Sequence, residues 1–555
     1  MSETQPLLSH FYVAVEGLDG PAGLELEADL LEVTVESSLH LPDLATLVLH
    51  DSRLRWADEP KLEPGKPLRI SARSDRDEHP LFDGEIVELE PEFTPGAQRL
   101  TVRAFDRLHR LARGRKVRSF LNVTDGDLVQ KIAAELGLRA QVDGTTQVHP
   151  YVFQANETNL EFLQGRAAAL GYVLYADGQT IHFAKPQAEG SPRELAWGQR
   201  LLEFRPRITT VDQMADFTVR GWDPAQRQEI VGRVQNGNGT PAVGERRKGG
   251  ELASQAFGLE ASHLTADRPI RTQAEADLLA QAMADRHASR FIEADGVCMG
   301  DSSILAASSI TLTGLGDRFS GTYVVTTVRH SYAAEQGYTT AFTVSGLHPA
   351  TLLSLLAPER APIPTTGLVV GIVTNNDDPD GAARVKVKFP WLTPDHESGW
   401  ARVVSVGAGP ERGVQFLPEV NDEVLVGFEQ GDIHHPYVLG GLWNGQDKPP
   451  LDQGEAVSGG KVQRRVIRSR SGHKITLDDS DGGGGVTVED KKGNKVFLDA
   501  AGNAMQLKVQ GDMTLEAQGN LTLKAQGRVE ITGTGVQVDG GGGTVDVKGS
   551  LINLN

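Results

Sequence analysis

Short stretches in which hydrophobic and polar residues strictly alternate run through the first 350 residues, and they predict β-strands. They lie at residues 24–27, 32–36, 85–89 and 100–105. Other segments carry apolar residues every three or four positions, which predicts amphipathic helices between the strands. We therefore predict an α+β fold for residues 1–355.

Capping residues locate the ends of three of these helices. One begins near Thr124 and ends at Gly137, and a second begins with a capping box at Thr158 and ends at Gly171. A third runs from Thr272 to about residue 290. None carries a recognisable chemical motif, so we interpret all three as packing elements.

A weak internal repeat links two distant stretches of this part. Gly84 is followed 21 residues later by Phe105, and Gly321 is followed at the same spacing by Phe342. Both stretches have the pattern of a β-hairpin that ends in Ala-Phe. Two interpretations stay open: a chance likeness of two hairpins, or a duplicated barrel-like domain within one chain.

A proline-rich linker with Pro358, Pro362 and Pro364 precedes a different pattern. Five short alternating stretches follow, separated by loops rich in Asp, Pro, Gly and Asn. Five strands at this spacing predict a small closed barrel of the OB type over residues 366–445. The stretches are residues 367–374, 384–389, 401–406, 423–428 and 437–443.

A second linker, residues 446–465, leads to a glycine-rich segment without Trp or helical periodicity, residues 466–555. From residue 511 to 543 a glycine recurs every eight positions, and each unit continues with alternating polar and apolar residues. The alternation slips once, at Val536 and Val538. The apolar positions expected to form the core of a needle are Met513, Leu515, Leu521, Leu523, Val529, Ile531, Val545 and Val547.

The repeat length indicates how this segment would fold. Eight is an even number, so the two-residue period of a strand keeps the same face apolar from unit to unit. Each unit supplies one strand of about five residues and a turn at glycine, which is a single wall and cannot enclose a core. Three chains would close a prism, so we predict a homotrimeric, intertwined β-helix. A meander within one chain is the alternative, and the absence of a regular carboxylate disfavours a calcium-binding solenoid.

Charge and composition exclude several classes of function. The chain has 55 Lys and Arg against 74 Asp and Glu, a net charge of −19, which disfavours binding to nucleic acid or to an anionic membrane surface. The single cysteine, Cys298, cannot form an internal disulfide, and we interpret it as a small buried hydrophobe. We find no signal peptide and no apolar run long enough to span a membrane, so we expect synthesis in the cytosol.

Candidate sites for chemistry are weak. His434 and His435 lack the further ligands of a metal site, so we interpret them as a turn before a strand. Two serine pairs, 302–303 and 308–309, lack a nucleophile-elbow context, and residues 482–485 are not followed by the Lys-Ser/Thr of a phosphate loop. We predict no catalytic residue, no metal and no cofactor.

The aromatic residues of the barrel raise the question of single-stranded nucleic acid, which OB barrels often bind. Residues 366–445 contain 5 Lys and Arg but 11 Asp and Glu, so their net charge is −6. We interpret the rings as core, and the basic run at 464–470 as a solvated strand face. The rings are Phe389, Trp391, Trp400, Phe428, Tyr437 and Trp443.

The order of these parts resembles the central spike of contractile injection machines: phage hub-and-spike proteins, the valine-glycine repeat G spike of type VI secretion, and extracellular phage-tail-like particles, the nearest in pattern. The most specific stretches lie in the barrel, at residues 384–392, 398–403, 416–426 and 437–445. The resemblance implies an α+β hub with two barrel-like tube domains, an OB-type barrel and a triple-stranded β-helix needle.

It also implies partners and a role. The family is homotrimeric, joins a hexameric inner tube and baseplate proteins at the hub, delivers cargo, and meets a target membrane only on firing. The expected role is structural and not enzymatic, because neither a lysozyme insertion nor a terminal toxin is visible. A cell-wall hydrolase and a nucleic-acid binder are weaker alternatives. A tip protein of the proline-alanine-alanine-arginine repeat (PAAR) type would bind the blunt end, at Leu551, Ile552, Asn553, Leu554 and Asn555.

Overall fold

The computed structural model describes residues 10–18, 20–74, 77–186, 189–223, 226, 228–239, 241–333, 336–344, 346, 367–393 and 395–553. The predicted linker prolines Pro358, Pro362 and Pro364 lie outside the described residues, as do Leu554 and Asn555. The chain divides into two compact units, Met1–Leu442 and Trp443–Asn555, which are described separately.

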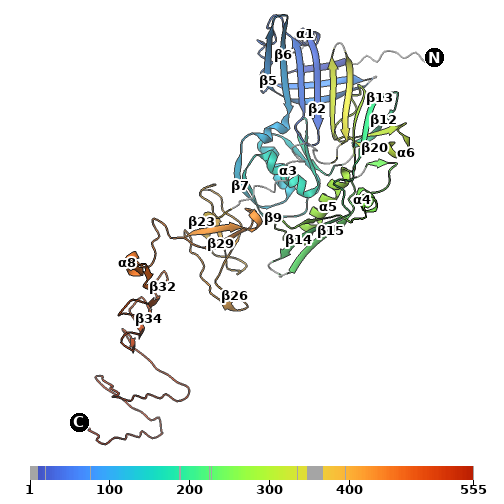
Figure 1. The fold of residues 1–555 in the computed structure, drawn as a ribbon. Helices are drawn as coiled ribbons and strands as arrows, with labels where there is room; N and C mark the ends of the chain where they lie inside the picture. The colour runs from blue at the N-terminus through green and yellow to red at the C-terminus, as the bar shows by residue number, and fades with distance from the viewer. Residues whose placement is uncertain are drawn as a thin grey trace, which may run out of the picture. The chain divides into compact units, whose positions relative to one another are not determined.

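A ten-stranded sheet dominates the first unit, with the strand order β1-β4-β5-β6-β3-β2-β21-β22-β18-β13. Strands from the beginning of the chain and strands from beyond residue 200 meet where β2 pairs with β21, from Glu32↔Ala333 to Ser38↔Thr327 (Figure 1). One continuous sheet thus contains both halves. Its strands are β1 (His10–Val15), β2 (Leu30–Ser38), β3 (Leu44–His50), β4 (Pro67–Ser74), β5 (Asp77–Thr94), β6 (Ala97–Asp106), β13 (Leu201–Ile208), β18 (Ile292–Met299), β21 (Thr327–Ala333) and β22 (Gly337–Val344).

The strand predicted at residues 24–27 is wrong, because this stretch lies in helix α1 (Pro21–Ala28). Pro21 occupies the first turn, where its fixed φ and missing N–H favour a helix. Leu26 is buried while Leu24 is 69% exposed, so only one of the two apolar residues faces the core. Four alternating residues are too few to distinguish the two periods.

The two halves of the weak repeat do not fold alike. Gly84 and Phe105 lie in the β5–β6 hairpin, as predicted. The prediction of a second hairpin that joins Gly321 to Phe342 is wrong. Gly321 lies in β20 (Gly321–Val324), which pairs with β16 and β19. Phe342 lies in β22, which pairs with β18 and β21. Strand pairing depends on distant segments, and residue spacing alone does not specify the partner. Duplication of a barrel-like domain stays a prediction.

An α/β subdomain follows β6 and has its own core around Leu128, Phe162 and Phe183. Both predicted caps are present, since Thr124 and Thr158 each form a capping box and Gly171 takes the left-handed conformation that ends its helix. The elements are η1 (Arg107–Ala112), β7 (Lys116–Val123), α2 (Asp125–Glu135), β8 (Arg139–Val142), β9 (His149–Glu157), α3 (Asn159–Leu170), β10 (Val173–Asp177) and β11 (Thr180–Ala184).

Among the described residues before the barrel, two smaller sheets and three further helices remain. One sheet has the order β12-β19-β20-β16 and the other the order β15-β14-β17, with α5 packed on the second. Cys298 is fully buried, which agrees with its interpretation as a hydrophobe. The elements are β12 (Glu189–Ala196), β14 (Asp216–Asp223), β15 (Gln228–Gln235), β16 (Ala242–Val243), α4 (Gly249–Phe257), β17 (Ser262–Thr265), α5 (Gln273–Ser289), β19 (Ser308–Thr313) and α6 (Gly316–Phe319).

The predicted five-stranded barrel is confirmed and is closed, in the order β23-β24-β25-β29-β28. Alternate residues such as Val385 and Val387 point into its core. Interpretation of the aromatic rings as core holds for Phe389 but is wrong for Trp391, which is 52% exposed because it follows the end of β24. The elements are β23 (Val369–Asn375), β24 (Arg384–Lys388), β25 (Ala401–Val403), β26 (Ala408–Gly409), β27 (Arg412–Gly413), β28 (Glu423–Phe428), η2 (Glu429–Gly431) and β29 (Pro436–Gly441).

The second unit contains a five-stranded antiparallel meander, β32 to β36, in sequential order. The described residues after Lys508 form no strand within the single chain. Trp443 belongs to this unit and is 71% exposed, so it is not a core ring either. The elements are α8 (Gln453–Ala456), β30 (Val457–Ser458), β31 (Lys461–Val462), β32 (Arg464–Arg468), β33 (Lys474–Asp478), β34 (Gly485–Glu489), β35 (Lys495–Asp499) and β36 (Ala504–Lys508).

Candidate functional site: an exposed apolar face on the second unit

The meander β32–β36 presents two rows of apolar side chains on one face. In the first row Ile467 pairs with Ile475, and the row continues across the other three strands. Directly opposed residues of an antiparallel sheet point to the same side, as do residues two apart in a strand. We call this surface the apolar face. Its members are Ile467, Ile475, Val488, Val496 and Leu507 in one row, and Leu477, Val486, Leu498 and Met505 in the other.

The opposite face of the same sheet is mostly polar, and its apolar members include Val466 and Phe497. Thr476 pairs with Thr487 across its centre. Ion pairs join Arg464 to Asp478 at 2.8 Å and Lys474 to Glu489 at 3.0 Å. The basic run that contains Arg464 is a solvated strand, as predicted. Charged side chains of these strands therefore concentrate on this face, and Arg465, which pairs with Leu477, is the one charged residue in the rows of the apolar face.

The apolar face is open in the single chain. Leu477, Leu498 and Met505 are 44%, 47% and 61% exposed. Soluble monomers rarely leave a contiguous apolar surface of this kind, and each such side chain would gain on the order of 1 kcal/mol on burial. A sheet with one apolar face needs a second layer to cover it.

The octad segment that follows is also open. All eight predicted needle-core residues are at least half exposed, from Met513 at 50% to Ile531 at 71%. The chain bends at residues 510–511, 518–519 and 526–527, which is the eight-residue spacing predicted for turns at glycine. Within the described residues 511–539, no backbone hydrogen bond joins one part of the segment to another. Whether these residues form a needle core stays a prediction.

The residues predicted to bind a tip protein are only partly described. Leu551 and Ile552 are 76% and 49% exposed, and Asn553 is exposed as well. Their role in binding a tip protein stays a prediction.

In the first unit, a hydrogen-bonded junction positions the barrel against the α/β subdomain. The Nε2 atom of His434 lies 3.1 Å from both the backbone nitrogen and the carbonyl oxygen of Phe153 in β9. The Tyr151 hydroxyl donates to the carbonyl of Glu397 at 2.7 Å. His434 lies in a turn before β29, as predicted, but its contact with β9 was not foreseen, because the sequence does not show that β9 lies beside the barrel.

Asp432 fixes the ring of His434. Its carboxylate accepts from the backbone N–H of His434 at 2.9 Å and lies 2.7 Å from Nδ1. Burial alone would raise the pKa of Asp432, but hydrogen bonds from His434 and His435 outweigh it and hold this pKa well below its usual value. The ionised carboxylate therefore keeps a proton on Nδ1 and leaves Nε2 for the strand.

A second set of contacts anchors the same β28–β29 connection to the residues before α5. Arg271, just before α5, forms an ion pair with Glu429 of η2, and the Tyr437 hydroxyl donates to the same carboxylate at 2.8 Å. The Gln430 amide donates to the carbonyl of Ala266 at 2.8 Å. The barrel is thus held at two separate places within the first unit.

The octad repeat predicts a needle core, but the apolar face of the meander was not predicted. The signal was present, because Ile475 and Leu477, and Val486 and Val488, alternate with polar residues. It was weaker in the next strand, where Phe497 stands between Val496 and Leu498. Their strands recur at nine to eleven residues and not at eight, so a search for the octad passes over them.

Among the described residues, no three or more His, Cys, Asp or Glu side chains are arranged to hold a metal ion. The helices of the described part include none that is both long enough and apolar enough to cross a membrane.

Two family models match the chain. The model described as the Alg8 N-terminal domain matches residues 9–334, and the model of the type VI secretion system/phage-baseplate injector OB domain matches residues 369–443. The second match coincides with the closed barrel. The resemblance to contractile-injection spikes is thereby supported at the residues that first indicated it.

Curated relatives are similar to part of the chain. The type VI secretion system spike protein VgrG1b of Pseudomonas aeruginosa is 30% identical over 157 residues, 27% of this chain and 20% of the relative. VgrG5 of the same organism is 31% identical over 143 residues, 24% of this chain and 16% of the relative. The chain thus spans about a fifth of the length of these relatives or less. Together with the barrel match they confirm the spike resemblance.

The fold has a counterpart among solved structures. A chain of the lidded Francisella PdpA-VgrG complex superposes with a TM-score of 0.52 at 10% identity, covering 86% of this chain and 76% of that chain. At this identity the likeness concerns the fold alone.

Proposed function

The chain belongs to the family of the Alg8 N-terminal domain, and from this premise we propose that it is the central spike of a contractile injection machine. In this role three copies form one spike. The hub, residues 1–355, connects to the hexameric inner tube and the baseplate, and the needle, residues 466–555, carries the tip that punctures the target envelope. The barrel and the linker at 446–465 join hub and needle.

The observation that carries this proposal is the one-sided meander. Nine apolar side chains cover one face of β32–β36, and they remain exposed or half-exposed in the single chain. Burial of this face between copies supplies the core that one chain lacks. The described residues 511–539 form no backbone hydrogen bonds with one another. In the same assembly, their backbone N–H and C=O groups form hydrogen bonds with the neighbouring copies.

Three copies fit better than two because of the octad segment. Each octad gives one strand of about five residues and then a bend, so each chain contributes one narrow wall at a time. Three such walls close a prism and leave no strand edge open. Two walls would leave edges exposed along the whole needle.

The continuous ten-stranded sheet supports the proposal for the hub. It joins two sets of strands from distant parts of the chain, β1 to β6 and the group β13, β18, β21 and β22. Three copies would then supply six such sets, which suits a hexameric tube.

The role is mechanical and not enzymatic, in keeping with relatives that are named spike proteins. Sheath contraction pushes the tube, and the interlocked walls of the needle carry the load through their hydrogen bonds. Assembly takes place in the cytoplasm, and the particle meets a target membrane only on firing. The description of the matched OB domain covers both type VI secretion and phage baseplates, so we place the function at the level of the contractile machine.

A partner at the needle end follows from the same proposal. The Francisella structure is a complex of VgrG with PdpA, so a relative of similar fold does assemble with another protein. For this chain we assign the contact with a PAAR-type tip protein to residues 551–555, and possible cargo would travel with the spike.

The oligomeric mass tests the proposal. Light scattering after size-exclusion chromatography should give three times the mass of the 59.8 kDa chain. Replacing both Leu521 and Leu523 by Asp should abolish the trimer or strongly lower its thermal stability, since it places charges at the trimer axis. Thr522→Asp, which adds a charge between them on the other face, should leave the trimer intact.

A trimer of normal stability in the Leu521→Asp, Leu523→Asp double variant would show that the three-wall arrangement is wrong. A monomeric parent chain under all conditions would refute the spike assembly itself.

A further inference from the structure

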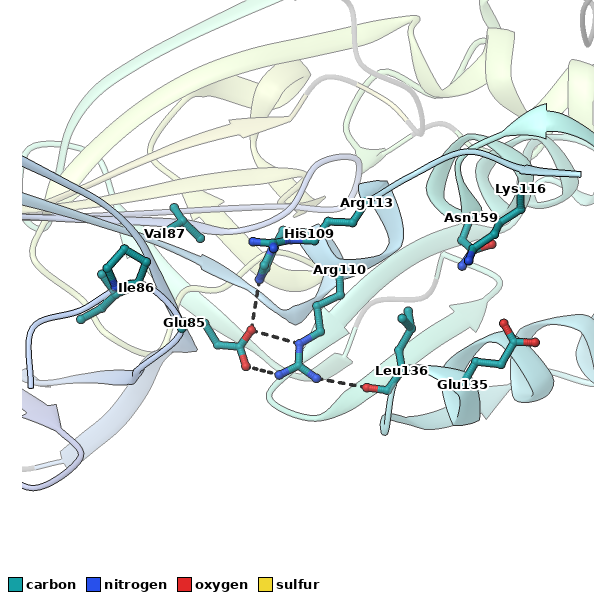
Figure 2. A pocket seen from close by; sticks show the side chains of 12 residues that line it. Glu85, Ile86, Val87, His109, Arg110, Arg113, Lys116, Glu135, Leu136 and Asn159 are labelled. Atoms are coloured by element: carbon teal, nitrogen blue, oxygen red, sulfur yellow. Dashed lines mark hydrogen bonds and ion pairs between the residues drawn. The ribbon is translucent and has the colours of Figure 1, made fainter.

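A cavity of about 680 Å³ lies between the ten-stranded sheet and the α/β subdomain (Figure 2). The loop before β4, strand β5, η1, the start of β7 and the adjoining ends of α2 and α3 surround it. This volume is typical of a ligand site and accommodates several side chains of a bound segment. The cavity is lined by Pro64, Gly65, Glu85, Ile86, Val87, His109, Arg110, Arg113, Lys116, Glu135, Leu136 and Asn159.

One wall of the cavity is held rigid by Arg110. Its guanidinium forms a fork with the carboxylate of Glu85 and also donates to the carbonyl of Leu136 at 3.1 Å, at the end of α2. His109 lies 3.2 Å from the same carboxylate. Burial alone would raise the pKa of Glu85, but Arg110 and His109 outweigh it and lower this pKa. Glu85 is therefore ionised and fully engaged.

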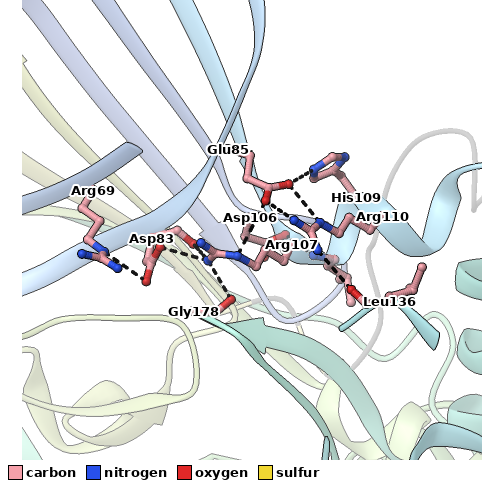
Figure 3. Close-up of polar contacts among 10 residues, drawn as sticks. Arg69, Asp83, Glu85, Asp106, Arg107, His109, Arg110, Leu136 and Gly178 are labelled. Carbon is pink, nitrogen blue, oxygen red and sulfur yellow. Dashed lines mark hydrogen bonds and ion pairs between the residues drawn. The ribbon is translucent and has the colours of Figure 1, made fainter. Parts of the chain in front are cut away.

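A parallel set of contacts fixes the sheet to the subdomain beside the cavity (Figure 3). The buried guanidinium of Arg107 lies 2.9 Å from the Asp83 carboxylate and 3.1 Å from the carbonyl of Gly178, in the β10–β11 turn. These contacts join β5 and η1 to the β10–β11 turn, so they fix the sheet and the subdomain beside the cavity.

The charges around the cavity are unequal. Residues 107–118 contain six Lys or Arg and no Asp or Glu, in a chain of net charge −19. Four of the six have carboxylate partners: Arg107 with Asp83, Arg110 with Glu85, Arg115 with Glu161, and Arg118 with Glu135.

The two remaining cations are Arg113 and Lys116, and both line the cavity. Among the described residues, neither side chain has a hydrogen bond or an ion pair. Both acidic residues of the lining, Glu85 and Glu135, are already neutralised by arginines. Burial lowers the pKa of His109, so this ring adds little charge at neutral pH. The cavity thus has an unbalanced positive rim.

We propose that this cavity binds an acidic segment of a partner protein, with its carboxylates on Arg113 and Lys116 and its apolar atoms against Ile86 and Leu136. The overall charge of the chain repels an acidic partner, so the basic rim selects one place and one orientation for docking. Long nucleic acids are disfavoured, because their phosphates would extend beyond two free cations onto an acidic surface.

The test uses the full chain and a fluorescein-labelled peptide of eight residues that alternates Glu and Asp with Leu. Fluorescence anisotropy should show binding that weakens with added salt. The double variant Arg113→Glu, Lys116→Glu should bind at least about tenfold more weakly, because it reverses both free charges. Arg53→Glu, Arg139→Glu, which changes two exposed arginines outside the cavity lining, should bind as the parent does.

Three results would overturn the proposal. One is the absence of peptide binding by the parent at millimolar concentration. Another is equal binding of a peptide with Gln and Asn in place of Glu and Asp, or unchanged binding by the Arg113→Glu, Lys116→Glu variant. The third is a change in the oligomeric mass of that variant, because the occupant would then be a second copy of the chain. Unchanged circular dichroism of the variant establishes that it is folded.

Discussion

The imidazole Nε2 of His434 lies 3.1 Å from both the amide nitrogen and the carbonyl oxygen of Phe153, a residue 281 positions earlier in the chain. Asp432 keeps the proton on the other ring nitrogen, so Nε2 accepts from the Phe153 N–H when the ring is neutral. When the ring is protonated, Nε2 can donate to the Phe153 carbonyl. One side chain therefore joins the barrel to β9 in either state.

The first prediction concerns this contact. His434→Ala should destabilise the barrel junction by about 1–2 kcal/mol, because it leaves the polar atoms of a buried strand residue without their partner. Hydrogen exchange of the Phe153 amide should become faster. His435→Ala is the matched control: it changes the neighbouring histidine, which contacts Asp432 but not β9. Equal exchange rates at Phe153 in both variants would contradict the assignment.

The second prediction concerns two buried carboxyl groups. Burial raises the pKa of Asp106 to about 7, and burial together with the neighbouring Asp106 raises the pKa of Asp43. An acid whose pKa is higher in the folded state stabilises the fold at low pH, and this contribution is lost as pH rises from about 4 to about 7. The contribution of this pair to the free energy of unfolding should therefore be smaller at pH 8 than at pH 5. Burial lowers the pKa of His40 and of His330 to about 4, so these two rings contribute in the opposite direction and only a matched variant separates the effects.

The variant Asp106→Asn isolates this effect. The Asp106 side chain accepts from the backbone N–H of Leu108 at 2.9 Å, and an asparagine carbonyl can accept in the same way. The variant should be more stable than the parent to urea at pH 8, and this difference in unfolding free energy should shrink as pH falls to 5. A pH dependence as steep as that of the parent would show that Asp106 is not the responsible group.

The third prediction uses two neighbouring residues of β36 that point to opposite faces. Met505 belongs to the apolar face, whereas Gln506 lies on the polar face, and both are exposed in the single chain. Met505→Asp should weaken assembly by about 2–3 kcal/mol, because a charge is buried between copies. Gln506→Asp should change the mass measured by light scattering little. Equal effects of the two variants would argue against burial of the apolar face.

The fourth prediction tests packing in the sheet of the first unit. A Cβ on Gly84 would lie 2.3 Å from the carbonyl oxygen of Phe105 and 2.4 Å from the ring of Phe82. Gly84→Ala should therefore cost about 2–3 kcal/mol of unfolding free energy. Gly165→Ala in α3 has open space and should stabilise the chain by up to about 1 kcal/mol. Thermal unfolding of both variants measures the contrast, and the same sign for both would refute this account of the packing.

Local patterns predicted local structure well. Thr124 and Thr158 cap their helices as expected, because a cap is satisfied by residues three positions away. The five barrel strands appear close to their predicted bounds, because the turn residues and the alternation agree with each other. Residues 24–27 form a helix instead of a strand, since four alternating residues are weaker evidence than a proline at the first helical turn.

Contacts between distant segments were not predictable in this way. The pairing of β2 with β21, the contact of His434 with Phe153, and the cavity beside Arg113 and Lys116 each join residues that only the tertiary structure brings together. The basic run at 107–118 is visible in the sequence. The sequence does not show which of its Lys and Arg side chains form ion pairs with a carboxylate.

The sequence by itself determined the barrel, the helix ends, the eight-residue period of the tail and the resemblance to contractile-injection spikes. These depend on side-chain periodicity and on neighbouring residues, so a single chain carries the information. Only the tertiary structure decided that the two halves of the first unit share one sheet, and that nine apolar side chains of β32–β36 lie on one open face. Both features depend on which strands pair with each other. The register of a strand pair is set by the residues that the pair can bury, and the sequence of one strand does not specify it.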